Sequence, residues 1–500
     1  MFRNIITAIS VTLIAAALVI FLVTMSQYPV GDDPGFTTSM LRSIVEQGKL
    51  RAEVPFFPQL HQVYGEGRVV TLGILAIIAR VFSIQDIFML PTYFAIGCIG
   101  ASLILIFLIT MTWLESRAAA LFSVLFLAFN KWFQANFWEG SYEQYTGLLV
   151  LVAMIYFLML WQKKKSRKFL VLSGLLLGLL YFTHQLGFLI GATVFMTTFF
   201  FYFRTFFRTK YTVLMTSLAV VAVATLFYLL SPGYFAVNTV GYPIPAMLSS
   251  SEGTPYLLLL VFIVAVVLIL FQKKNIILMS WLFISLIFSQ SMLIGVPFYA
   301  YRFNVYFIVA LAVISGIVVQ YVQQHVKNPL RPAMAYMLLC LAALVQFIVV
   351  DEFNYIHGIA AWVSGQKNNP SSVILDQDVA AFRWLGDNSD KSAVAVAPFK
   401  WGYYLPALSG RKVILDTAVG GDARDARYPY AVKAQKMFAT VSSQEASGLA
   451  KDLEASYVVW DASITRFPDR YPSYVKNKFD NAEYFTKVYD RGTVAIYQVK

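Results

Sequence analysis

Five acidic residues that stand beside apolar runs are the first candidates for chemistry in this sequence. They are Asp32, Asp33, Glu139, Glu143 and Glu252. A single acid in such a place is most often a helix cap or a solvated group. A set of carboxylates can instead bind a hard cation such as Mg²⁺ or Mn²⁺, which offsets their repulsion and can stabilise a leaving phosphate. The acids therefore predict a divalent metal site, provided that the fold brings their segments together.

An arginine and an aromatic segment extend this set. Arg302 begins an apolar run in "YRFNVYF", where it can anchor the run at a membrane surface or fork onto phosphate oxygens. The segment "PFKWGYYLPALSGR" carries Trp401, Tyr403 and Tyr404, which can pack in a core or against a membrane. A lipid phosphate with its tail between helices and its head beside the acids and Arg302 would suit displacement of the phosphate by an outside nucleophile.

The composition indicates which elements position these residues. The chain has 500 residues, of which 58% are hydrophobic and 13% charged, and this predicts a polytopic membrane protein. The net charge of +12 comes largely from short basic loops between apolar runs, which favours cytoplasmic loops over nucleic-acid binding. These loops are 162–168, 204–210, 272–275 and 325–331. Cys98 and Cys340 lie in apolar runs and are expected to be buried thiols.

The spacing of the basic loops predicts the topology. Ile5–Met25 is expected to be an uncleaved signal anchor that leaves the N-terminus in the cytoplasm. Each pair of basic loops then encloses a helical hairpin, and the first of these, 169–203, turns at His184, which is expected to be a hydrogen-bonded structural group. Because the crossings must be even in number, either 69–84 or 118–136 crosses, and we favour 118–136, with 69–84 as an interfacial helix.

This reasoning predicts about eleven membrane helices and two domains. Residues 1–350 would form the transmembrane domain, with a first extracytoplasmic loop at 26–67, and residues 351–500 would form an extracytoplasmic, water-soluble α/β domain. Short β-type runs such as "AVAVAP", "KVILD", "YVVWD" and "TVAIYQV" support the second domain. All the candidate residues would then lie outside, on a multi-pass protein of the plasma membrane if the chain is prokaryotic.

Five motifs in this order resemble the catalytic subunit of oligosaccharyltransferases, within the GT-C superfamily of membrane glycosyltransferases. They are "DPGF" at 33–36, "GSYEQY" at 140–145, "SSSEGTP" at 249–255, "YRFNVYF" at 301–307 and "FKWGYY" at 399–404. The last resembles the family's WWDYG motif, with Lys400 in place of its aspartate, and Tyr145 stands where the second motif has an acid. The resemblance implies a GT-C fold and transfer of a sugar or oligosaccharide from a polyprenyl (pyro)phosphate, most often to a protein asparagine.

The resemblance also implies roles for the acids. Asp33 would bind the metal and engage the nucleophile, helped by Asp32. Glu143 would complete the metal site, and Glu139 could compensate for the missing acid of the second motif. Glu252 would orient the acceptor amide.

The remaining motifs imply binding roles. Arg302 would bind the phosphate of the lipid-linked donor. Trp401, Tyr403 and Tyr404 would bind the protein or glycan acceptor.

Two alternatives remain open at this point. One is a GT-C transferase that uses a polyprenyl-monophosphate sugar with a glycan or lipid acceptor, which the altered WWDYG motif favours. The other is a non-enzymatic transporter or an inactive relative. A transporter should carry charges within its spans and have broken helices, whereas the long apolar runs of this chain are almost free of charge.

Overall fold

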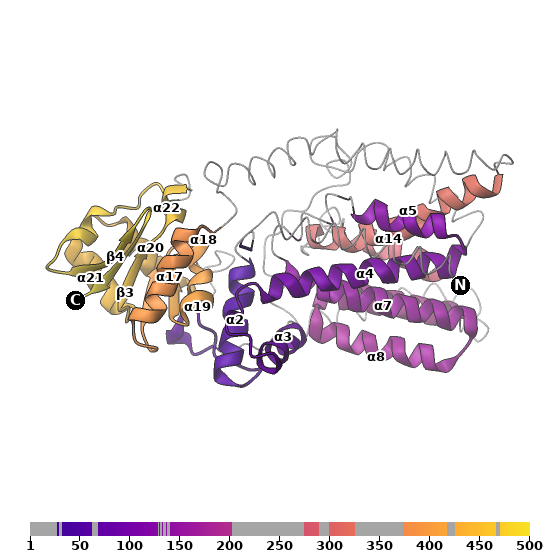
Figure 1. Ribbon diagram of the computed structural model, residues 1–500, viewed down its shortest axis with the longest axis horizontal. Helices are drawn as coiled ribbons and strands as arrows, with labels where there is room; N and C mark the ends of the chain where they lie inside the picture. The colour runs from indigo at the N-terminus through magenta and orange to yellow at the C-terminus, as the bar shows by residue number, and fades with distance from the viewer. Residues whose placement is uncertain are drawn as a thin grey trace. The chain divides into compact units, whose positions relative to one another are not determined.

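The computed structural model describes most of the chain in two compact units (Figure 1). The described residues are 28–29, 33–62, 69–128, 130, 133, 137, 141–202, 275–289, 300–325, 374–417, 426–466 and 471–500. One unit, here called the helical unit, comprises Met1–Met25, Ala95–Phe137 and Glu143–Ala361. The other, here called the mixed unit, comprises Ser26–Phe94, Trp138–Tyr142 and Trp362–Lys500.

The helical unit consists of long apolar helices. Its described helices are α4 (Leu90–Leu114), α5 (Arg117–Ala128), α7 (Tyr142–Lys164), α8 (Arg167–Thr183), α9 (Gln185–Tyr202), α13 (Ile276–Ser289) and α14 (Ala300–His325). The helices carry apolar side chains on nearly all of their sides, as expected of helices in lipid or in a large core. Within the described residues, α4, α7, α9 and α14 are long and apolar enough to cross a membrane. The membrane character predicted from composition is thereby supported.

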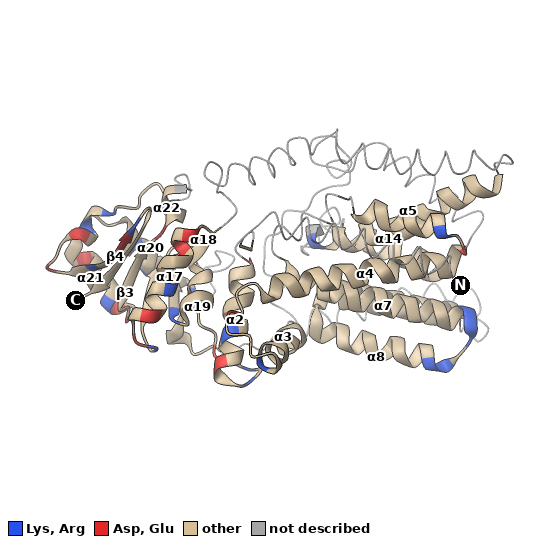
Figure 2. Cartoon of the chain, viewed as in Figure 1, with Lys and Arg blue, Asp and Glu red and all other residues tan. Residues whose placement is uncertain are grey.

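Polar contacts tie neighbouring helices of this unit together. Cys98 on α4 lies 3.8 Å from the hydroxyl of Thr146 on α7, and Ser173 on α8 donates to the Met154 carbonyl on α7 at 3.0 Å. Figure 1 shows α4, α7 and α8 running side by side. Figure 2 shows the Lys and Arg residues of the α7–α8 turn grouped at one end of these helices. This turn corresponds to the first basic loop predicted as cytoplasmic.

Several predicted crossings can be compared with the described helices. α8 and α9 form the expected hairpin over 169–203 and turn at His184. α3 (Val69–Val81) and α5 are about 20 Å and 18 Å long, so neither crosses a 30 Å hydrocarbon core by itself. The choice between 69–84 and 118–136 therefore stays a prediction. The runs at 5–25, 211–271 and 333–350, with Cys340, lie outside the described residues.

The mixed unit is built on a five-stranded sheet. The strands are β1 (Val394–Ala397), β2 (Lys412–Leu415), β3 (Tyr457–Trp460), β4 (Phe485–Arg491) and β5 (Val494–Val499), in the order β2-β1-β3-β5-β4. The first three are parallel, and β5 and β4 run antiparallel to their neighbours. The four β-type runs read from the sequence are β1, β2, β3 and β5, so these strand predictions are confirmed. 

Short helices accompany this sheet. They are α17 (Asp376–Asn388), α18 (Phe399–Gly402), α19 (Tyr404–Ser409), α20 (Tyr428–Ala439), α21 (Ser443–Asp452) and α22 (Ala462–Arg466). They place one apolar side on the strands, because residues such as Phe382 on α17 and Phe438 on α20 are fully buried in the same core as Val396 and Val458.

The first loop packs with this sheet. Phe56 forms a parallel bridge with Val413 of β2, where the Phe57 and Val413 amides each donate across the pair at 2.9 Å. The Lys412 ammonium lies 3.0 Å from the Glu53 carboxylate beside it. The predicted division of the chain at residue 350 stays a prediction, while residues 26–94 share a compact unit with residues 362–500. The physical reason is that an edge strand offers unpaired backbone groups, which the loop satisfies.

Candidate functional site

Asp33 is the first residue of α2 (Asp33–Gln47), which packs on α19 in the mixed unit. A negative charge is favourable at this end, because the helix dipole is positive there. Ser39 donates its hydroxyl to the Tyr403 carbonyl at 2.7 Å, and Arg42 donates to the Ala407 and Leu408 carbonyls at 2.9 and 3.1 Å. The helix that begins at Asp33 is therefore bonded to the segment that carries the predicted aromatic motif.

The approach of α2 to α19 depends on a glycine. A Cβ atom added at Gly35 would lie 2.9 Å from the Tyr404 ring and 3.0 Å from the Tyr403 carbonyl carbon. Real Cβ atoms are not found so close to neighbouring carbons, so any larger residue would push the helices apart. The sequence motif "DPGF" therefore has a packing reason for its glycine, two residues after the acid.

The aromatic residues of the motif are buried in this contact. Trp401 and Tyr404 are 0% exposed and Tyr403 is 5% exposed. The Tyr403 ring lies edge-on to Phe36 and Phe56, with centroid distances of 5.7 and 5.1 Å. In this structure the three rings belong to the core of the mixed unit, and an acceptor-binding role for them remains a proposal.

One functional candidate that sequence reasoning missed is Asp416, which fixes the start of the aromatic motif. Its carboxylate is 4% exposed and accepts the Phe399 amide and the Tyr474 hydroxyl, both at 2.7 Å. The available signal was an acid directly after the strand "KVILD". Acids at the carboxyl ends of parallel strands meet at one edge of a sheet, where loops from other strands also begin.

In the helical unit the structure joins the segments of Glu143 and Arg302. Glu143 lies in the first turn of α7 and is 4% exposed. The next residue, Gln144, donates its side-chain amide to the Arg302 carbonyl in the first turn of α14 at 2.5 Å. The beginnings of α7 and α14 therefore meet, and two of the predicted site residues lie at the same end of this unit.

His184 is hydrogen-bonded, as the sequence predicted. Its Nδ1 atom accepts from the Gly187 amide at 3.2 Å and lies 2.7 Å from the Tyr306 hydroxyl. Tyr306 is fully buried on α14 and was not singled out in the sequence. A tyrosine four residues after Arg302, on the same face of a predicted helix, was the signal that could have identified it.

The predicted metal site is only partly described. Asp32, Glu139 and Glu252 lie outside the described residues, and Asp33 and Glu143 belong to different units. Within the described part of the chain, no three His, Cys, Asp or Glu residues lie close enough together to hold a metal ion. A metal site in this protein is therefore a proposal.

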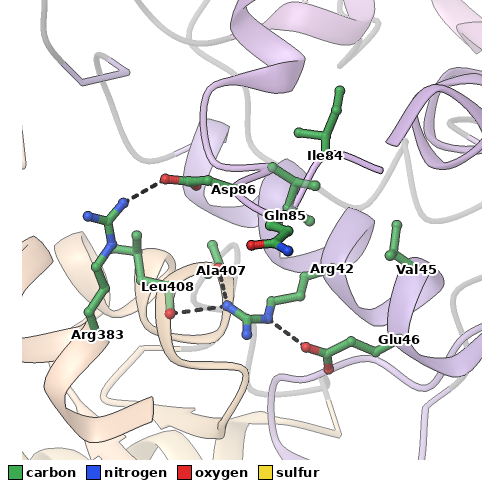
Figure 3. A pocket seen from close by; sticks show the side chains of 10 residues that line it. Arg42, Val45, Glu46, Ile84, Gln85, Asp86, Arg383, Ala407 and Leu408 are labelled. Carbon is green, nitrogen blue, oxygen red and sulfur yellow. Dashed lines mark hydrogen bonds and ion pairs between the residues drawn. The ribbon is translucent and has the colours of Figure 1, made fainter. Parts of the chain in front are cut away.

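A cavity of 510 Å³ lies in the mixed unit, between α2, residues 84–87, α17 and α19. Figure 3 shows two ion pairs in its lining, Arg42 with Glu46 at 2.7 Å and Arg383 with Asp86 at 2.8 Å. All four side chains are at least 30% exposed, and such pairs contribute little to stability. Arg42 is nine residues along α2 from Asp33, or about 13 Å, so this cavity is separate from the predicted catalytic acid.

These features define a protein of long apolar helices with an added α/β unit, and solved structures that share its fold are GT-C membrane glycosyltransferases. Neither protein-family profiles nor curated protein sequences match the chain. One similar structure is the Archaeoglobus fulgidus oligosaccharyltransferase in complex with Zn and sulfate, with 14% identity and a TM-score of 0.60 over 95% of this chain and 71% of that one. The resemblance predicted from the five motifs is thus confirmed at the level of the fold.

Two further structures carry lipid phosphates. AglB of Archaeoglobus fulgidus, in complex with an inhibitory peptide and a dolichol-phosphate, is 12% identical, with a TM-score of 0.56 over 92% of this chain and 70% of that one. ArnT of Cupriavidus metallidurans, bound to undecaprenyl phosphate, is 11% identical, with a TM-score of 0.58 over 98% of this chain and 97% of that one. At these sequence identities, the similarity between the chains is a similarity of fold.

Proposed function

We propose that this protein is a membrane glycosyltransferase that moves a sugar or oligosaccharide from a polyprenyl (pyro)phosphate to an acceptor outside the cytoplasm. The observation that carries the proposal is the meeting of α7 and α14 through Gln144 and the Arg302 carbonyl, which places Glu143 and Arg302 at one end of the helical unit. An arginine at the end of an apolar helix suits a phosphate head group whose tail lies among such helices, and a nearby buried acid suits a cation that bridges it to the phosphate. The shared fold with structures that hold dolichol-phosphate and undecaprenyl phosphate supports this ligand class.

Each acid then has a proposed task. Asp33 would engage the nucleophile with help from Asp32, and Glu143 would bind Mg²⁺ or Mn²⁺ together with Asp33 and, in part, Glu139. The metal would supply positive charge for the leaving phosphate. Glu252 would orient the acceptor.

Arg302 would bind the donor phosphate directly. Its planar guanidinium can bond two phosphate oxygens at once, which fixes the orientation of the head group as well as holding it.

A protein asparagine is the first acceptor to test, because one of the similar structures is tethered to an acceptor peptide that contains an NVT sequon. In that case Trp401, Tyr403 and Tyr404 would contribute to acceptor binding. Their burial in the described structure favours the second candidate, a transferase that takes a polyprenyl-monophosphate sugar and a glycan or lipid acceptor.

Donor binding tests the proposal. Arg302→Gln should weaken binding of undecaprenyl phosphate to the full-length protein in lipid nanodiscs by roughly 10-fold or more, since a hydrogen bond to a charged group contributes about 1.5–3 kcal/mol. Arg117→Gln is the control, because Arg117 begins a different apolar helix, α5. Equal affinity in the two variants would return Arg302 to the role of a membrane-surface anchor.

The acceptor is decided by a transfer assay. Lipid-linked sugar donors with one or two phosphates are each offered with an Asn-X-Thr peptide or with a glycolipid. Transfer to peptide asparagine from the pyrophosphate donor would support the oligosaccharyltransferase alternative. Transfer only from the monophosphate donor to the glycolipid would support the second candidate, and transfer in no combination, despite normal donor binding, would favour an inactive relative.

A further inference from the structure

A histidine at the tip of the α8–α9 hairpin is bonded to the helix that carries Arg302. The Nδ1 atom of His184 accepts the Gly187 amide hydrogen, so Nδ1 carries no hydrogen of its own. The Tyr306 hydroxyl lies 2.7 Å from the same atom, within hydrogen-bonding distance. Both side chains are buried, His184 at 9% and Tyr306 at 0% exposure. The hairpin and α14 are thus joined by a buried hydrogen bond.

Two glycines allow this contact. A Cβ atom at Gly147 of α7 would lie 2.3 Å from the Cβ of His184, so the hairpin tip rests directly on the α7 backbone. A Cβ atom at Gly187 would lie 3.1 Å from the Tyr306 hydroxyl oxygen. The imidazole therefore occupies a space that only glycine at 147 leaves open, and α7, the hairpin and α14 meet at one point.

The contact between His184 and Tyr306 also lies close to the first turn of α14, which carries Arg302. Tyr306 follows Arg302 by four residues, which places the two side chains on one face of the helix. One turn away on α7, Gln144 holds the Arg302 carbonyl, and Gly147 supports His184. Arg302 is thus held through its backbone by Gln144, and its helix is held through Tyr306 by His184.

We infer that His184 and Tyr306 are positioning residues for Arg302 and set its place toward the phosphate of a lipid-linked donor. This inference rests on the donor site proposed above. Removing the hydroxyl of Tyr306 leaves the ring and the packing, but it frees the first turns of α14 from the hairpin. Neither side chain is proposed to contact the donor. The whole effect of removing the Tyr306 hydroxyl on donor binding should therefore pass through Arg302.

A double-mutant cycle tests this dependence in full-length protein in nanodiscs, with undecaprenyl phosphate as the probe. Tyr306→Phe should raise the dissociation constant about 2- to 12-fold, the range expected for one hydrogen bond. In an Arg302→Gln background the same change should have no further effect, because the residue that it positions is gone. The KM for the acceptor should stay near that of the wild type.

Matched controls are available on the same hairpin. Tyr181→Phe alters a tyrosine three residues before His184 whose ring packs edge-on to Phe188, and it should leave donor binding unchanged. Gly147→Ala should weaken donor binding at least as much as Tyr306→Phe. Gly174→Ala on α8, where an added Cβ would meet nothing within 4 Å, should not.

The outcomes separate this inference from the proposed function. If Arg302→Gln binds undecaprenyl phosphate normally, the proposed donor site is wrong and the inference falls with it. If Arg302→Gln is impaired but Tyr306→Phe binds normally, only the inference is wrong. The inference is also overturned if the two effects multiply in the double variant, because His184 and Tyr306 would then act independently of Arg302.

Discussion

The contact between α2 and α19 can be tested by adding one methyl group. Gly35→Ala introduces a Cβ atom 2.9 Å from the Tyr404 ring, about 1 Å closer than an ordinary contact between carbons. The Tyr404 ring is fully buried and cannot move into solvent, so α2 must shift or the core must repack. Overpacking of this kind typically costs about 1–3 kcal/mol.

A second glycine in the same unit provides the reference. Gly448 lies on α21, and a Cβ atom there would meet nothing within 4 Å. Gly448→Ala should therefore stabilise the protein by about 0.5–1 kcal/mol through helix propensity alone. Because both variants gain a similar propensity term, the difference between them measures mainly the overpacking.

The assay is thermal unfolding of the full-length variants in detergent, combined with sugar transfer. Gly35→Ala should melt below Gly448→Ala by about 1 °C for each kcal/mol of overpacking if the 500-residue chain unfolds as a whole. Transfer should also fall in Gly35→Ala under conditions where the protein is folded, because Asp33 is two residues from the displaced atom. If Gly35→Ala is as stable and as active as Gly448→Ala, then α2 does not pack on α19 as described.

Two further predictions concern charge and topology. Burial lowers the pKa of Lys478, whose side chain donates to the Phe438 and Val475 carbonyls, to about 8. Because the unfolded chain then holds the proton more tightly, the free energy of unfolding should rise between about pH 8 and pH 10 by at most about 1.4 kcal/mol per pH unit. Lys478→Met should remove this pH dependence. If denaturation curves of the variant show the same pH dependence as the wild type, Lys478 is not its cause. Cysteines placed at Lys164 and Ser443 should react with impermeant reagents from opposite sides of the membrane, whereas labelling of both from one side would contradict the predicted topology.

Much of the fold could be predicted from local patterns in the sequence. The apolar runs of α4, α7, α9 and α14 are long enough to signal membrane helices by composition alone. The hairpin over 169–203 follows from two apolar runs with a polar turn, and the strands β1, β2, β3 and β5 from short β-branched runs. These signals involve only residues that are close together in the sequence, so the helices and strands could be predicted without knowledge of the rest of the chain.

The candidate site could be predicted only as a set of separate motifs. The sequence placed Asp33, Glu143, Arg302 and the aromatic segment in order along the chain, and it suggested that His184 is hydrogen-bonded. It did not indicate that Gln144 bonds the Arg302 carbonyl, or that Asp416 holds the start of the aromatic motif. Nor did it indicate that the three aromatic side chains would be buried.

The tertiary structure decided the contacts between distant segments. Ser39 and Tyr403 are 364 positions apart in the chain, and His184 and Tyr306 are 122 apart. No local pattern encodes such a pair, because either residue could be satisfied by many other partners. Steric fit selects one of these partners. At Gly35 and Gly147, only the absence of a side chain allows the segments of Tyr404 and His184 to approach so closely. The first loop joined the β-sheet for a similar reason, since the open edge of β2 and the backbone at Phe56 satisfy each other only once both are folded.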